Sequence, residues 1–143
     1  MLVAAACCPC PPLLVPEVAS GAADELKALR AACMDAVGVL AAARPDVLVV
    51  VGPAEEAGRG PYPQGARGSF RGYGVDLAVR LGPAGGAEQE PGGRELPPPL
   101  VVGAWLLERA EWNGAPVEGL GVGEPLAGER CAAAGREIAA RAG

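Results

Sequence analysis

The run DVLVVVG, residues 46–52, restricts the fold of this chain more than any other segment. Its apolar residues follow one another without the polar–apolar alternation of a strand that has one face in water. Such a continuous run is typical of a parallel strand that is covered on both faces. Parallel strands are joined by crossover connections that usually contain a helix. We therefore expect an α/β fold with a mixed or mostly parallel sheet flanked by helices.

The expected crossover lies before this run. Residues 2–8 are apolar and predict a short buried strand, and Ser20 is placed to cap a helix with Asp24 and Glu25 in its first turn. Apolar residues then recur every three or four positions until Arg44-Pro45 ends the helix. These residues are Leu26, Leu29, Cys33, Val37 and Leu40. Residues 2–52 are thus predicted to form one right-handed β-α-β unit.

The rest of the chain alternates loops with shorter elements. In order, we expect a Gly/Pro-rich loop at 53–74, a half-exposed strand at 75–81, a low-complexity loop at 82–99, a helix at 100–112, a weak strand at 117–123, and a helix from Pro125 onward through Leu126, Cys131 and Ile138. No strand follows that last helix. Residues 1–143 therefore read as one domain resembling the front part of a larger α/β domain, with an exposed sheet edge that favours a homo-oligomer.

Composition narrows the function classes. The chain has 143 residues, half of them apolar, which suffices for the core of one domain. Its net charge of −5 argues against binding to nucleic acid and to anionic membranes. Without an apolar run of membrane-spanning length or a signal-peptide pattern, we expect a cytoplasmic protein with reduced cysteines. The absence of histidine removes the commonest general base and metal ligand.

The segment CCPCPPLLVPE, residues 7–17, holds Cys10 between two prolines. Proline fixes its own φ and restricts the preceding residue, so this loop should be rigid. Cys10 is a candidate ligand for a soft metal with Glu55 and Glu56, because loops that leave parallel strands meet at one sheet edge. The alternatives are a nucleophile that lacks a histidine base, or a plain loop cysteine beside solvated acids. Cys33 and Cys131 are expected in the core.

The segment ARGSFRGYG, residues 66–74, combines positive charge with aromatic rings. It is a candidate substrate loop, in which guanidinium groups and rings hold an anionic aromatic molecule by charge and stacking. The residues concerned are Arg67, Phe70, Arg71 and Tyr73. The alternatives are an ordinary structured loop and an RG-rich nucleic-acid segment, the latter disfavoured in an acidic chain.

Four segments, CPCPPLLVPEV, DVLVVVGP, ARGSFRGYGVDL and VVGAWLLERAEW, together resemble the class III extradiol ring-cleavage dioxygenases, in the branch of subunit-B-like and Memo-like domain proteins. The likeness extends over most of the chain. It implies an α/β sandwich in which two histidines and a glutamate hold Fe(II), and O₂ opens a catechol-type ring. Cys10 stands at the position of the family's first histidine, and no histidine occurs near Pro53–Glu56, where the second is expected.

The resemblance therefore implies an extradiol-dioxygenase-like domain with a degenerate metal site. By this likeness its cofactor is Fe(II), unless no metal binds, and its partner is a small aromatic substrate if the chain is active. Two alternatives remain open. One is a non-enzymatic binding or scaffold protein on the same fold, because a fold does not fix a function. The other is an incomplete gene product.

Overall fold

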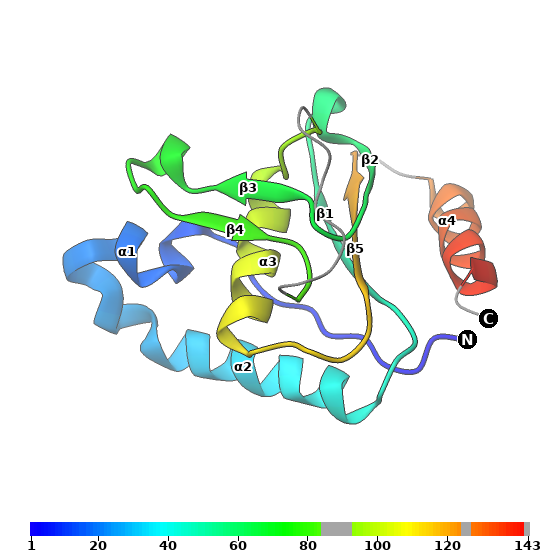
Figure 1. Cartoon of the computed structure of the whole chain (residues 1–143), viewed down its shortest axis with the longest axis horizontal. Coiled ribbons are helices and arrows are strands. Elements are labelled where there is room, and N and C mark those ends of the chain that lie inside the picture. Colours follow the sequence, from blue (N-terminus) through cyan, green and yellow to red (C-terminus); the bar gives the residue numbers. More distant parts are fainter. Residues whose placement is uncertain (84–92, 124–126, 142–143) are drawn as a thin grey trace.

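The computed structural model describes residues 1–83, 93–123 and 127–141. The fold is mixed α/β, with a three-stranded sheet, a two-stranded ribbon and flanking helices (Figure 1). The elements in chain order are η1 (Pro12–Leu14), α1 (Pro16–Ala19), η2 (Ser20–Leu26), α2 (Lys27–Ala42), β1 (Leu48–Pro53), η3 (Glu56–Gly58), β2 (Gly60–Tyr62), β3 (Arg67–Ser69), η4 (Arg71–Tyr73), β4 (Ala78–Arg80), α3 (Pro98–Arg109), β5 (Val117–Val122) and α4 (Gly128–Arg141).

The three-stranded sheet has the order β1-β5-β2. Strand β1 is parallel to β5, with Leu48 opposite Val117, and β2 is antiparallel to β5. The predicted parallel strand is thus confirmed, and the segment expected to be a weak strand is the centre of the sheet. The ribbon pairs β3 with β4 in antiparallel fashion.

The first strand of the predicted β-α-β unit is wrong. Residues 2–8 form no helix or strand, and all but Ala4 and Cys8 are exposed. Alanine, which fills positions 4–6, has low strand propensity and little side chain to bury, so this segment gains little from a sheet position. The crossover that joins the two parallel strands instead runs from β1 through the β3-β4 ribbon and α3 to β5.

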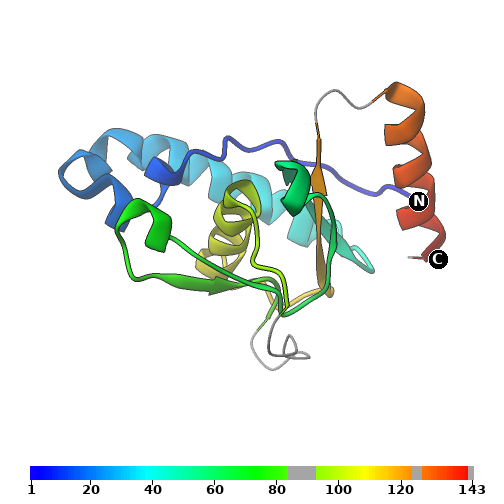
Figure 2. The same cartoon turned by 90° about the horizontal axis from the view of Figure 1, so that it is seen from above.

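The expectation that β1 is covered on both faces is also wrong. Its α3-facing side is closely packed, because Gly103 of α3 leaves room for the Val50 side chain and Gly52 lies against Pro99. Its other side is more open, and Val51 is 56% exposed. Helix α4 lies on the side of the sheet away from α3 (Figure 2), but none of its described side chains is buried.

Helix α2 follows its predicted apolar stripe. Cys33 and Val37 are buried, and Leu29 and Leu40 pack against the core. The predicted start is wrong, because residues 20–26 form a 3₁₀ segment and the side chain of Ser20 caps no helix. Ser20 instead follows the last residue of α1 with a φ of 51°, and this positive φ changes the direction of the chain there.

Helix α3 confirms the helix predicted at 100–112 and is the centre of the core. It begins at Pro98, where proline fits a helix's first turn because the missing N–H would have no partner there. Seven of its residues are buried, and they lie on all sides of the helix: Leu100, Val101, Val102, Ala104, Trp105, Leu106 and Leu107. A helix that is apolar all round must be covered on every side, and α3 contacts β1, β3, β4 and α2.

The remaining expectations have mixed outcomes. The loop predicted at 53–74 contains β2 and β3, and β4 confirms a strand within 75–81. Residues 84–92 of the low-complexity loop, and Pro125 and Leu126, lie outside the described residues. The last predicted helix is confirmed as α4. Cys131 is exposed on this helix, so the expectation that it lies in the core is wrong. The same expectation for Cys33 is confirmed, because Cys33 is buried.

No helix within the described ranges combines the length and the apolar character needed to cross a membrane.

Candidate functional site

The predicted metal ligands lie on exposed segments. Cys10 belongs to the coil before η1, and Glu55 and Glu56 lie where the chain leaves β1. They were expected together because two parallel strands would end at one sheet edge, but residues 2–8 form no strand. Within the ranges that the structure covers, no three Cys, Asp or Glu side chains gather closely enough to hold a metal ion. The metal site therefore stays a prediction.

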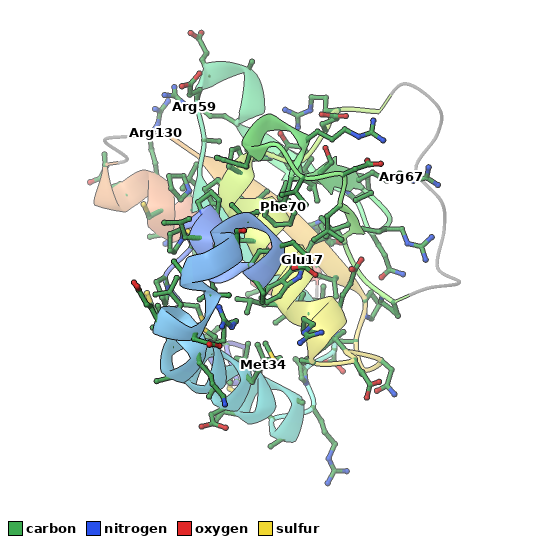
Figure 3. All side chains as sticks on the ribbon, turned by 90° about the vertical axis from the view of Figure 1, so that its left-hand side faces the viewer. Glu17, Met34, Arg59, Arg67, Phe70 and Arg130 are labelled. Atoms are coloured by element: carbon green, nitrogen blue, oxygen red, sulfur yellow. The ribbon has the colours of Figure 1, made fainter. Side chains whose placement is uncertain are left out.

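The candidate substrate loop is divided between the core and the surface. Phe70 is fully buried, and its backbone N–H donates to Leu77 O at 2.9 Å. Figure 3 shows Phe70 inside the molecule and Arg67 on its outside. Arg71 is exposed and pairs with Asp76 at 3.0 Å, and Tyr73 is exposed. The ring of Phe70 is thus already covered by the protein, and the substrate loop stays a prediction.

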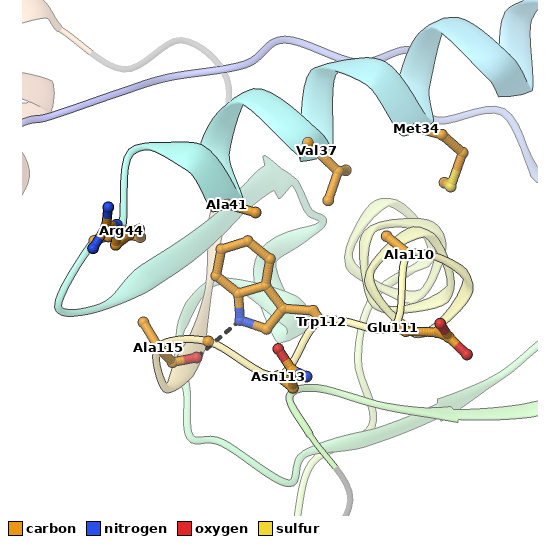
Figure 4. A pocket seen from close by; sticks show the side chains of 12 residues that line it. Met34, Val37, Ala41, Arg44, Ala110, Glu111, Trp112, Asn113 and Ala115 are labelled. Carbon is orange, nitrogen blue, oxygen red and sulfur yellow. Dashed lines mark hydrogen bonds between the residues drawn. The ribbon is translucent and has the colours of Figure 1, made fainter.

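A pocket of about 420 Å³ lies where α2 and α3 end (Figure 4). Its apolar wall comes from the last turns of α2 and from the indole of Trp112, which follows α3. Polar groups stand at its rim. The lining residues are Met34, Val37, Gly38, Ala41, Arg44, Pro45, Ala110, Glu111, Trp112, Asn113, Gly114 and Ala115.

The chain reverses at both helix ends to make this pocket. Arg44 and Glu111 have φ values of 48° and 52°, which residues with a side chain seldom adopt. These left-handed residues end α2 and α3 in the way that a C-terminal cap does. The indole N–H of Trp112 donates to Ala115 O at 2.9 Å, and this bond fixes the ring as one wall. Helix termination by itself accounts for both left-handed positions, and it places the two chain reversals beside the pocket.

The positively and negatively charged side chains of the pocket lie apart from each other. Arg44 and Glu111 lie at its two ends, with the indole of Trp112 between them (Figure 4). Both helices direct their carboxyl ends toward this region, and each such end carries a partial negative charge. The pocket can therefore hold an apolar body in its middle and orient a polar substituent at either end.

Sequence reasoning missed this pocket. It used Arg44-Pro45 only as a helix end and placed Trp112 within a helix. The segments that form the walls are about seventy residues apart along the chain. The available signal was the Trp-Asn-Gly turn after an apolar helix, which places a large ring at a chain reversal.

The cysteines differ in chemical environment. Cys7, Cys10 and Cys131 are exposed, whereas Cys33 is only 2% exposed. Burial raises the pKa of the Cys33 thiol above its ordinary value of 9.0, and the neighbouring Cys8 thiol adds to this effect by its charge and a hydrogen bond. Cys33 should therefore be a weak nucleophile in the folded chain.

At pH 8 we expect an aromatic disulfide reagent to label Cys7, Cys10 and Cys131 rapidly and Cys33 only after unfolding in urea. Cys33→Ser should remove only the slow phase. Because the folded thiol ionises at higher pH than the unfolded one, stability should be unchanged by this group below pH 9 and should fall as the pH rises further. Rapid labelling of Cys33 in the native chain would contradict its burial.

Comparisons of this chain with protein-family models, with curated proteins and with solved structures find no match.

Proposed function

We propose that this chain is a non-catalytic binding domain of the extradiol-dioxygenase-like kind, and that it holds a small aromatic molecule in the pocket between the ends of α2 and α3. The observation that carries the proposal is the pocket itself, with its apolar wall and separated polar ends. Its volume of about 420 Å³ falls in the range of small-molecule sites.

The shape of the pocket favours a flat apolar ligand. The indole of Trp112 faces the α2 side chains Val37 and Ala41 across the pocket (Figure 4). An aromatic ring placed there gains contact with the indole beyond simple burial of its apolar surface. Arg44, Glu111 and Asn113 at the rim can then bind a hydroxyl, carboxylate or amine on the ring.

The loss of ring cleavage is the second part of the proposal. A facial triad needs three ligands and open positions for substrate and O₂, and this chain has no histidine to supply two of them. The proposal therefore keeps the aromatic ligand class that the resemblance implies and omits Fe(II) as a resident cofactor. It includes a cytoplasmic location, where thiols stay reduced, and no nucleic-acid or membrane partner.

Gly38→Leu is the variant that tests the pocket. Gly38 lines the pocket on α2, and a Cβ added there meets nothing within 4 Å. A leucine should fill the pocket without strain and also strengthen the helix, because glycine is a poor interior helix residue. We expect benzyl alcohol, followed by two-dimensional ¹H–¹⁵N NMR, to shift the Trp112 indole signal in the native chain. The affinity of the Gly38→Leu variant for benzyl alcohol should be lower by about tenfold or more. This corresponds to a change of about 1.4 kcal/mol in the free energy of binding.

Gly135→Leu is the matched control, because Gly135 is also a helical glycine with open space around its Cβ, but it lies on α4. It should bind benzyl alcohol as the native chain does. Equal binding in Gly38→Leu would refute the pocket. In a separate arm, the chain is loaded anaerobically with Fe(II) and given catechol and O₂. Ring-cleavage product above a no-protein control would overturn the non-catalytic part of the proposal alone.

A further inference from the structure

A second pocket, of about 360 Å³, adjoins the pocket between the ends of α2 and α3. Its walls come from the end of β4, from the last turn of α3 and from the turn that follows α3. Three residues of that turn, Glu111, Trp112 and Asn113, line both pockets, so the two spaces meet along it. A ligand that occupies the first pocket therefore has a neighbouring space for a further group.

The second pocket contains charged residues of both signs. Arg80 at the end of β4 is half-buried, and among the described residues none forms a hydrogen bond or ion pair with its guanidinium group. The backbone N–H of Arg80 donates to Glu108 Oε1 at 2.9 Å, and this bond holds the Glu108 carboxylate beside β4. The pocket thus presents a guanidinium without a described partner and a carboxylate of fixed position.

The α3 side of this pocket favours a cation. Glu108 lies in the last turn of α3, and Glu111 follows the end of that helix. The carboxyl end of a helix carries a partial negative charge, so cations are stabilising there and carboxylates are not. An ammonium group at this place would meet two carboxylates and the negative end of α3.

We propose that the two pockets together bind one aromatic α-amino acid, with its ring beside Trp112, its ammonium group at Glu108 and Glu111, and its carboxylate at Arg80. This inference rests on the proposed function, because the ring occupies the pocket described there. It adds the identity of the polar substituent and the place where that substituent is held.

The pairing of charges selects this ligand class. An aromatic amine would leave the Arg80 guanidinium without an anion, and an aromatic acid would leave Glu108 and Glu111 without a cation. An amino acid carries both charges on one carbon, and each forms charge-assisted hydrogen bonds with its opposite group. One methylene separates that carbon from the ring, which allows the ring and the charged head to occupy adjoining pockets.

Four ligands that share a benzene ring test this assignment on the full-length chain, with the Trp112 indole signal followed by two-dimensional ¹H–¹⁵N NMR. They are L-phenylalanine, phenethylamine without the carboxylate, 3-phenylpropionate without the ammonium group, and benzyl alcohol without either charge. L-Phenylalanine should bind at least about tenfold more tightly than each of the other three, because it alone pairs with both sides of the second pocket.

Two charge-removing variants separate the two sides. Arg80→Gln should lower the affinity for L-phenylalanine and 3-phenylpropionate by about tenfold and leave that for phenethylamine unchanged. Glu108→Gln should lower the affinity for L-phenylalanine and phenethylamine and leave that for 3-phenylpropionate unchanged. Glutamine keeps an oxygen that accepts the bond from the Arg80 N–H, so this variant removes the charge and not the contact.

Arg136→Gln and Glu137→Gln are the matched controls, because both residues are exposed on α4 and line neither pocket. They should bind all four ligands as the native chain does. If L-phenylalanine bound no more tightly than its analogues while benzyl alcohol still shifted the indole signal, this inference alone would be overturned. If none of the four ligands shifted that signal, the proposed function would be overturned with it.

Discussion

Phe70→Ala is expected to lower the free energy of unfolding by roughly 3–5 kcal/mol. The ring of Phe70 is fully buried, and it is among the largest side chains in the core. Its removal loses the transfer free energy of the ring and leaves a cavity that the ribbon and α3 can fill only partly. Urea unfolding followed by circular dichroism measures the change.

The control for this prediction comes from the same loop. Tyr73 is an aromatic residue three positions later, but it is 45% exposed. Tyr73→Ala should change the free energy of unfolding by no more than about 0.5 kcal/mol, as is usual for surface substitutions. If Phe70→Ala kept the native stability and instead lost the binding of an aromatic ligand, the loop would be a site and the burial of Phe70 would be wrong.

Gly121→Ala should also destabilise the chain strongly, by roughly 3 kcal/mol, the upper part of the usual range for overpacking. Gly121 lies in the central strand opposite Gly60 of β2. A Cβ at this position would collide with the carbonyl oxygen of Gly58, which is backbone and also accepts a hydrogen bond from Tyr62 Oη at 2.8 Å. Relief of the collision requires β2 to move away from β5. Thermal unfolding should show a lower Tm.

Gly123→Ala separates a backbone collision from a general intolerance of side chains near this end of β5. The three atoms nearest to a Cβ at Gly123 all belong to the guanidinium of Arg59, an exposed side chain that can rotate away. We expect a change below about 1 kcal/mol, because only a flexible side chain has to move. A large effect of Gly123→Ala, or none of Gly121→Ala, would show that the close approach of β2 to β5 is not what requires glycine.

The local pattern of side chains was enough to predict the main elements. The apolar stripe of α2, the all-apolar helix α3 and the continuous apolar run of β1 each follow from spacing along the chain, and all three are present. These elements are selected by the faces that they must bury, and such faces can be counted in the sequence. The absence of histidine and the acidic charge likewise led to predictions about the classes of site without any structure, and these stay predictions.

The identity of the strand that pairs with β1 could be known only from the tertiary structure. The sequence of β1 indicates a parallel strand, but it does not say that the neighbour is β5 and not residues 2–8. That choice depends on long-range contacts, whose free energy is a property of two distant segments together. The burial of Phe70 has the same origin, because a Gly-rich loop looks exposed in sequence until the ribbon folds over α3.

The candidate site shows most clearly the difference between what the local sequence predicts and what the tertiary contacts decide. Cys10, Glu55 and Glu56 are suitable ligands one by one, but the first strand that would have brought them together does not form. The pocket at Trp112 has no motif in the sequence, because its walls come from two helix ends that meet only through the packing of α2 on α3. The sequence by itself determined which segments could be helix, strand or ligand. The tertiary structure decided which of them are neighbours, because proximity between distant segments is set by the whole core.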